Sequence, residues 1–233
     1  MNIEHVILSF ETATRNSSLA VLRGEKVLAE WHGDEHFVQS EGLLFEIEKL
    51  LKIVNIDFSE IGLLAVVKGP GSFSGLRVGL ATAKGFAMAG KIPAIGVTTL
   101  ETCAAANNAD GMNFVVLSAG RGNVFAQSFE VNIENKVIAA RDEPQHVALE
   151  TIKGQIIQAS IENKIVHVIA AREILADISN LSSEVVKISE PHQNLAASAG
   201  KIALRRYLEN TESSTDLKPL YLRPVDIGKP KTS

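Results

Sequence analysis

The stretch from residue 69 to residue 79 reads Gly-Pro-Gly-Ser-Phe-Ser-Gly-Leu-Arg-Val-Gly, and it separates two segments of different character. Before it, the short apolar run Leu63–Val67 is bounded by glycine, which is typical of a buried strand. After it, the run Leu76–Ala89 is rich in alanine and contains no proline, which predicts a helix. The loop therefore joins a strand to a helix start, where free backbone N–H groups and the helix dipole favour an anion.

This loop departs from three motifs that it resembles in part. The third glycine of a dinucleotide fingerprint arrives one residue late, at Gly75, and the Gly-Lys-Ser/Thr of a P-loop does not occur, because Lys84 follows alanine. The centre of a G-x-S-x-G nucleophile elbow is occupied by Phe73. Two interpretations carry equal weight on the residues alone: a tight turn in which Ser72 or Ser74 caps the helix, and an anion-binding loop.

Outward from this loop, the chain shows one order of elements twice. A three-strand meander leads into helix–strand units in the first half, and a similar succession follows in the second. In the first half we expect strands at Val6–Phe10, Leu19–Leu22, Lys26–Trp31, Leu63–Val67 and Ala94–Val97, and helices at Ser40–Val54, Ser74–Ala89 and Thr98–Ala106. In the second half we expect strands at Phe114–Leu117, Val124–Val131, Val137–Ala140 and Ile165–Ile169, and helices at Ala148–Ala159 and Ala171–Ile178. This pattern predicts a duplicated α/β architecture with two lobes.

The division between the lobes is expected at a hinge between Ala106 and Asn113. We predict an N-terminal lobe over residues 1–106, which a later helix at about residues 194–209 completes by packing back on it. A smaller second lobe covers residues 107–190. Residues 210–233 are more polar and form an extended tail that includes Pro219–Arg223.

The composition narrows the classes of function. With 233 residues, 45% hydrophobic and 21% charged, the chain matches a globular protein rather than a disordered or membrane-embedded one. Its longest apolar run, Ile61–Val67, is far shorter than the ~20 residues of a membrane helix. A net charge of −4 argues against charge-driven nucleic-acid binding by the chain alone. The single cysteine, Cys103, rules out an intrachain disulfide, and with no signal peptide we expect a cytoplasmic protein.

The segment Gly69–Ala87, GPGSFSGLRVGLATAKGFA, resembles the signature of the TsaB (YeaZ) family, the non-catalytic bacterial partners of the tRNA threonylcarbamoyladenosine transferase TsaD. Three shorter stretches extend the resemblance. FETAT at residues 10–14 is similar to the family's D-T-S-T opening, SEGLL at 40–44 to its H-S-E-x-L-L helix start, and PLYLR at 219–223 to its P-x-Y-L-R tail. The resemblance implies a two-lobed actin-like ATPase (ASKHA, ribonuclease H-like) fold, in agreement with the duplication.

The sequence also departs from the family pattern, and four of the departures bear on chemistry. The usual first aspartate is Glu11, and the usual histidine before the first helix is Gln39. The motif D-A-R-R-G-E-V-Y of the second lobe appears as SAGRGNVF, which places Ser118 and Gly120 where an acid and an arginine are usual. Losing that acid removes an oxygen directed at Mg²⁺, and losing one arginine weakens a phosphate clamp. We therefore expect no independent nucleotide turnover.

Two groups of site residues follow from the resemblance. The nucleotide- or anion-binding group comprises Thr12, Thr14, Gly69, Gly71, Ser72 and Arg121. The partner-interface group comprises Leu43, Leu44, Ile47, Arg77, Leu80 and Ala83, on two helices that the resemblance places in a four-helix contact with the partner. The alternative for the small residues of the second helix is that they pack on the parent sheet.

Neither a metal centre nor a nucleophile is predicted. The catalytic relative carries an H-x-x-x-H pair on the helix after its glycine-rich motif, and the matching positions here are Thr99 and Cys103, which do not replace two imidazoles. His32 and His36 have the same spacing, but a glycine lies between them, and a solvated loop is favoured there over a metal site. Cys103 is interpreted as a core residue rather than a nucleophile.

These expectations describe an accessory subunit rather than an enzyme. The resemblance implies a scaffold that works with a TsaD-like catalytic subunit and a TsaE-like ATPase to transfer threonylcarbamoyl from threonylcarbamoyl-AMP to N6 of adenosine 37 in ANN-decoding tRNAs. It implies self-association without the partner, contact with tRNA only through the complex, no membrane, and no tightly bound cofactor, with ATP or ADP at the complex interface. The alternatives are an independent actin-like ATPase or phosphotransferase and, less favoured, a metallopeptidase.

Overall fold

The first of two β-sheets is built from the N-terminal strands. The computed structural model describes residues 5–33, 40–135, 137–162, 165–209 and 217–223. Its first sheet has the order β3-β2-β1-β4-β5, made of β1 (Val6–Glu11), β2 (Ser18–Arg23), β3 (Lys26–His32), β4 (Ile61–Val67) and β5 (Ala94–Val97). The meander β1–β2–β3 is antiparallel, whereas β4 runs parallel to β1 and β5 parallel to β4.

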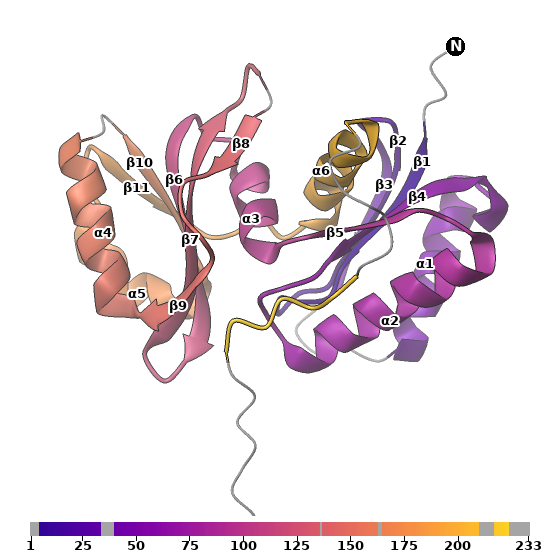
Figure 1. Ribbon diagram of the computed structural model, residues 1–233, viewed down its shortest axis with the longest axis horizontal. Coiled ribbons are helices and arrows are strands. Elements are labelled where there is room, and N and C mark those ends of the chain that lie inside the picture. Colours follow the sequence, from indigo (N-terminus) through magenta and orange to yellow (C-terminus); the bar gives the residue numbers. More distant parts are fainter. Residues whose placement is uncertain (1–4, 34–39, 136, 163–164, 210–216, 224–233) are drawn as a thin grey trace, which may run out of the picture.

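The second sheet repeats this plan. Its order is β11-β10-β6-β7-β8, with β9 also paired to β7, made of β6 (Gly111–Gly120), β7 (Asn123–Asn132), β8 (Val137–Ala140), β9 (Gln145–Ala148), β10 (Val166–Ala170) and β11 (Val186–Ser189). The central strand β6 is antiparallel to β7 and parallel to β10, as β1 is to β2 and β4. The predicted duplication is confirmed, and this two-lobed arrangement is the actin-like fold (Figure 1).

Helices cover both faces of the first sheet, which explains why every residue of β1 is buried. On one face α1 (Ser40–Ile53) and α2 (Phe73–Gly90) enclose a core with Leu8 and Phe10. On the other face α6 (Ala196–Leu208) packs on Ile7 and Leu63. The late helix α6 therefore packs on the first sheet, far along the chain from its strands.

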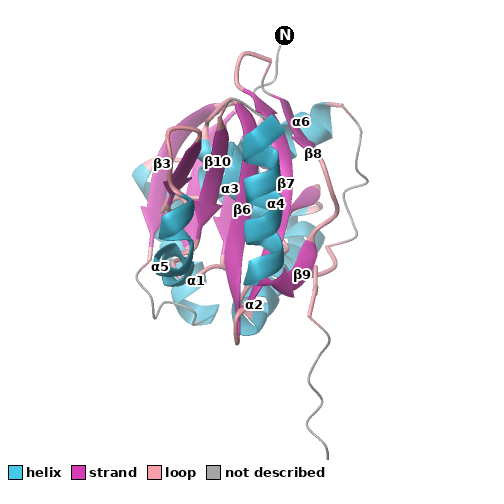
Figure 2. Ribbon diagram, turned by 90° about the vertical axis from the view of Figure 1, so that its left-hand side faces the viewer, coloured by secondary structure: helices cyan, strands magenta, loops and turns pink. Residues whose placement is uncertain are grey.

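The second sheet is also covered on both faces. The outer face carries α4 (Leu149–Glu162) and the short α5 (Leu175–Ile178), whose apolar residues join those of β6 and β10 in one core (Figure 2). The inner face carries α3 (Thr99–Asn107), in which Leu100 and Cys103 pack against Val115 and Phe129. Helix α3 thus lies between the two sheets and contacts α6 as well. Among the residues that the structure describes, no helix is long and apolar enough to cross a membrane.

Specific polar contacts fix the helix starts and the junction between α3 and α6. The hydroxyl of Ser72 accepts the backbone N–H of Gly75 at 3.3 Å, and that of Thr98 accepts the N–H of Glu101 at 3.1 Å, so both residues act as N-caps. The Glu101 carboxylate also receives Arg206 Nη2 at 2.6 and 2.7 Å. This pair joins α3 to α6.

Candidate functional site: the cleft between the lobes

The glycine-rich loop packs directly on the turn that follows β1. The N–H of Ser72 donates to the carbonyl of Ala13 at 2.7 Å, and the hydroxyl of Thr12 donates to the carbonyl of Gly75 at 2.8 Å. A Cβ atom on Gly71 or on Gly75 would lie well inside 3.0 Å of the Ala13 or Thr12 carbonyl oxygen, a separation that real Cβ atoms do not show. These glycines therefore serve the close approach of two backbones, and Ser72 is the cap that the tight-turn interpretation expected.

Glu11 holds the same turn from the other side. Its carboxylate is fully buried and accepts the N–H and the hydroxyl of Thr14, each at 2.7 Å, together with the N–H of Ala13. Burial raises the pKa of Glu11 from 4.5 to about 7, although all three donors favour the charged form. Glu11, which stands where the family has an aspartate, thus stabilises the β1–β2 turn through these hydrogen bonds.

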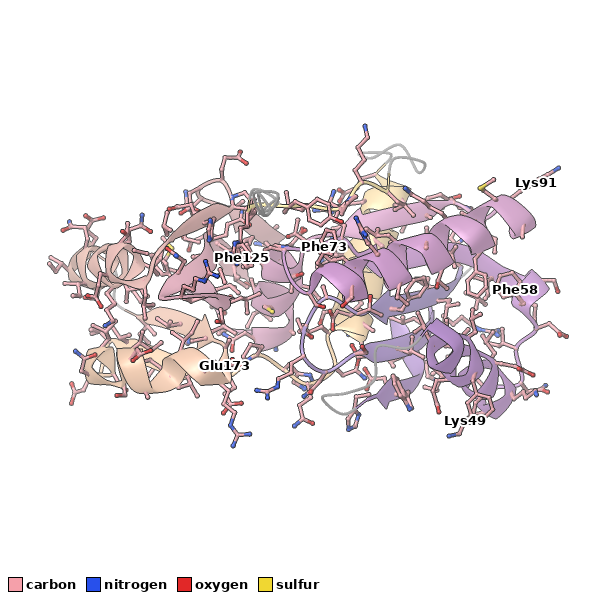
Figure 3. All side chains as sticks on the ribbon, turned by 90° about the horizontal axis from the view of Figure 1, so that it is seen from below. Lys49, Phe58, Phe73, Lys91, Phe125 and Glu173 are labelled. Atoms are coloured by element: carbon pink, nitrogen blue, oxygen red, sulfur yellow. The ribbon has the colours of Figure 1, made fainter. Side chains whose placement is uncertain are left out.

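A cleft of about 840 Å³ lies between the lobes, within the size range of small-molecule sites. The first lobe lines it with the β1–β2 turn (13–16) and the glycine-rich loop (70–73), and the second lobe with Phe125 and residues 117–119 and 171–173. Residues 190–193 and 195 and the C-terminal residues 220–223 complete the wall. In Figure 3, Phe73 and Phe125 lie at the junction of the two lobes, one from each side.

The charged and polar groups of the cleft are unevenly satisfied. Arg15 Nη1 and Glu173 Oε1 meet at 3.1 Å, which connects the two lobes, but the two side chains are 57% and 48% exposed. Solvent therefore screens this pair, which contributes at most about 1 kcal/mol. Asn16 also lines the cleft, and its Oδ1 atom is buried without a hydrogen-bond partner. Arg172, Glu190, His192 and Arg223 also line it.

The predicted nucleotide- or anion-binding residues divide into two sets. Thr14, Gly71 and Ser72 line the cleft. Thr12 is 3% exposed and lies behind the lining, and Gly69 lies against Leu220 and Leu76. Arg121 is exposed at the tip of the β6–β7 hairpin, outside the residues that line the cleft.

Sequence reasoning missed Arg15, Arg172 and the C-terminal residues of the lining. The available signal was topological. In both lobes the cleft is lined at the C-terminal ends of the central strand and its parallel neighbour, which is where ligands bind in open α/β sheets. Residues 13–16, 70–73 and 171–173 follow β1, β4 and β10, and residues 117–119 are the end of β6 itself.

Four of the six predicted partner-interface residues require correction. Leu43, Ile47, Leu80 and Ala83 are 2%, 2%, 4% and 0% exposed, and they belong to the core between the helices and the first sheet. The apolar stripe at spacings of three and four residues is the side of each helix that a sheet buries, so it is not available to a partner. Leu44 and Arg77 are exposed.

The outer surface of these helices contains residues that the sequence analysis did not select. Phe45, Ile53 and Met88 are 62%, 68% and 82% exposed. Ala81 and Gly85 are also exposed on α2, and a Cβ atom on Gly85 would meet no atom within 4 Å. A shallow hollow of about 380 Å³ on α1 is lined by Phe45, Ile53, Glu48, Lys49 and Lys52.

The positions that match the metal pair of the catalytic relative are interior. Thr99 and Cys103 are both 0% exposed. Burial, with a smaller effect of the Glu11 charge, raises the pKa of the Cys103 thiol, so this thiol stays neutral inside the core. Across the described parts of the chain, no three His, Cys, Asp or Glu side chains come together as a metal site. Residues 34–39, which include His36 and Gln39, lie outside the described residues.

Two duplicated lobes with a cleft at the ends of their central strands define the actin-like class of proteins. Within that class, a family model described as TsaD, tRNA N6-adenosine threonylcarbamoyltransferase, matches residues 38–222, and the chain belongs to this family.

Named relatives fall in the same family. The chain is 30% identical over 125 residues to the tRNA threonylcarbamoyladenosine biosynthesis protein TsaB of Bacillus subtilis and 35% identical over 100 residues to that of Escherichia coli. These matches span 53% and 42% of the chain, and 55% and 42% of the relatives, so the chain spans about half the length of the relatives or less. A crystal structure described as an uncharacterised protein with similarity to peptidase YeaZ from Pseudomonas aeruginosa superposes with a TM-score of 0.80 at 16% identity, over 94% of this chain and 100% of that chain. The predicted resemblance to the TsaB (YeaZ) family is confirmed.

Proposed function

We propose that this chain is a cytoplasmic, non-catalytic activator of a TsaD-like transferase. With that subunit and a TsaE-like ATPase, it supports threonylcarbamoyl transfer from threonylcarbamoyl-AMP to N6 of adenosine 37 in ANN-decoding tRNAs. The observation that carries this proposal is the burial of the positions that match the reactive residues of the catalytic relative and the usual first aspartate. Glu11, Thr99 and Cys103 are each 0% exposed, and Glu11 is bonded to its own turn. Buried side chains of this kind support the fold and do not reach a substrate.

The outer surface of α1 and α2 supports the partner part of the proposal. Exposed apolar side chains gathered on one surface mark protein contacts more often than isolated ones do. Here Leu44, Phe45 and Ile53 are exposed on α1 and Met88 is exposed on α2. The exposed Ala81 and Gly85 of α2 are small enough to admit a neighbouring helix. We propose that the TsaD-like subunit docks on this surface and that a second copy of the chain occupies it when that subunit is absent.

The cleft fits a nucleotide only in part. Arg15 and Arg172, which line the cleft, carry guanidinium groups suited to phosphate. Arg15 is already paired with Glu173, however, and the carboxylate of Glu11 is turned away from solvent. We therefore propose that ATP or ADP binds at the interface of the complex rather than tightly to the isolated chain, and that tRNA is contacted through the complex.

Reconstitution tests the activator role. We expect the yield of modified tRNA, measured with the TsaD-like subunit, the TsaE-like ATPase, threonylcarbamoyl-AMP and tRNA, to depend on this chain. Ala81→Arg should abolish both the yield and co-elution with the TsaD-like subunit, whereas Ile161→Arg, at a 75% exposed position on α4, should leave both unchanged. Equal yield without the chain would refute the activator role. Saturable ATP turnover by the isolated chain would instead support an independent ATPase.

A further inference from the structure

The C-terminal residues Leu217–Arg223 run from the first lobe to the second. Leu217 is 3% exposed and belongs to the first-lobe core. The N–H of Leu220 donates to the carbonyl of Lys68 at 2.7 Å, directly after the end of β4. The Leu220 carbonyl oxygen in turn lies only 2.9 Å from the position that a Cβ atom on Gly69 would take, and Gly69 has a φ of +107°. The near end of the segment is therefore fixed to the glycine-rich loop.

The far end of the segment reaches the second lobe. Leu222 packs against the cluster that α3 forms with the second sheet. Residues 220–223 line the cleft together with Ser118 and Phe125. Figure 1 shows this segment passing from the first lobe to the junction of the lobes. One stretch of chain thus contacts both lobes and supplies one wall of the cleft between them.

Three stacked side chains connect this segment to the outer surface of α2. The Arg77 guanidinium lies 3.9 Å from the centroid of the Phe73 ring, and the Phe73 and Tyr221 rings lie 5.4 Å apart at 36°. Phe73 is 44% and Tyr221 41% exposed, so solvent reaches the stack and weak competing contacts can alter it. Arg77 is exposed on the helix to which the partner is proposed to bind.

We propose that Leu217–Arg223 is a strap that fixes the opening of the cleft, and that the Arg77–Phe73–Tyr221 stack transmits binding on α2 to this strap. The second clause rests on the proposed function. A partner group that engages Arg77 removes the cation from the Phe73 ring, which changes the environment of Tyr221. The strap then moves relative to Ser118 and Phe125, and the wall of the cleft moves with it.

The two tyrosines of the chain provide a direct probe. Incorporated 3-fluorotyrosine places one fluorine on Tyr221 and one on Tyr207. Tyr207 belongs to α6, and its ring centroid lies 5.1 Å from that of His5, so its fluorine resonance serves as an internal control. In Leu222→Ser we expect the Tyr221 fluorine resonance to move toward that of the free amino acid and the Tyr207 resonance to stay. Backbone hydrogen exchange at residues 69–73 and 117–119 should become at least about threefold faster. Ile161→Ser, on the far side of the second lobe, is the matched control.

The two clauses fail in different ways. Unchanged exchange and an unmoved Tyr221 resonance in Leu222→Ser would overturn the strap. For the second clause, adding the TsaD-like subunit should move the Tyr221 resonance, and Arg77→Ala should move it without any partner. A complex that forms on a size-exclusion column while Tyr221 stays fixed would overturn the transmission alone. No complex at any concentration would refute the proposed docking, and the second clause with it, while Leu222→Ser still decides the strap.

Discussion

The buried carboxyl of Glu11 makes stability depend on pH in an unusual direction. Its pKa is about 7 in the folded chain against 4.5 as the ordinary value, and each pKa unit corresponds to about 1.4 kcal/mol. Between these two values the folded state binds more protons than the unfolded state. The contribution is therefore fully present below about pH 4.5 and is lost as the pH rises through about 7. Ionising Glu11 inside the fold costs on the order of 3 kcal/mol.

The variant Glu11→Gln isolates this effect. Its amide oxygen can still accept the N–H groups of Ala13 and Thr14, and the Thr14 hydroxyl keeps its second acceptor, the Asn16 carbonyl at 3.2 Å. We expect urea unfolding of the unmodified chain to lose about 2 to 3 kcal/mol between about pH 5 and pH 8 relative to Glu11→Gln. Subtracting the two profiles removes the opposite contribution of His167, whose pKa burial lowers.

A control at a solvated carboxyl completes this measurement. Glu143 is exposed, so Glu143→Gln should reproduce the pH profile of the unmodified chain. Parallel profiles for Glu11→Gln and the unmodified chain would refute the argument. They would mean that the three donors around Glu11, rather than its burial, set its pKa.

Three further predictions concern packing and can be measured by thermal or urea unfolding. Ala83→Arg should unfold the chain or lower its free energy of unfolding by about 3 kcal/mol or more, because Ala83 is fully buried in the core. A well-folded variant would place that side of α2 outside the core. Gly75→Ala should lower the free energy of unfolding by about 2 kcal/mol or more, because its Cβ meets the Thr12 carbonyl. Gly85→Ala has open space around it and should stabilise α2 by about 0.5 to 1 kcal/mol. Equal effects of the two changes would contradict the close-approach argument. Glu101→Gln should cost about 2 kcal/mol because it weakens the paired contact with Arg206, and a loss near zero would show that α3 and α6 hold together without it.

The strands that the sequence predicted best are those written as short runs of mainly apolar residues. The strands Ala94–Val97 and Val137–Ala140 were predicted to the residue, and β1, β2 and β4 within two residues at each end. The strands β9 and β11 were not predicted. Each has only four residues, with the sequences QHVA and VKIS, and each is partly exposed to solvent. Short strands of mixed polarity are stabilised by pairing with β7 and β10, which is tertiary information that periodicity does not contain.

The site was harder to predict than the fold, and the two helices show why. Periodicity selected Leu43 and Ile47 on α1, which is correct for helix formation but identifies the side that faces the sheet. The exposed Phe45 and Ile53 lie off that stripe, so they do not contribute to the periodic signal. A partner surface consists of residues that the core leaves exposed, so it is recognised only when the position of the parent sheet is known.

The two lobes differ in the turn that follows their central strand. In the second lobe the hairpin between β6 and β7 is closed by Arg121 and Gly122, with φ values of 55° and 74°, between the paired residues Gly120 and Asn123. Such a tight turn carries Arg121 to an exposed tip. The equivalent turn of the first lobe, residues 12–17, is longer, and Glu11 fastens it so that residues 13–16 line the cleft. The same strand order therefore gives a turn that lines the cleft in the first lobe and a short hairpin whose tip lies outside the lining in the second.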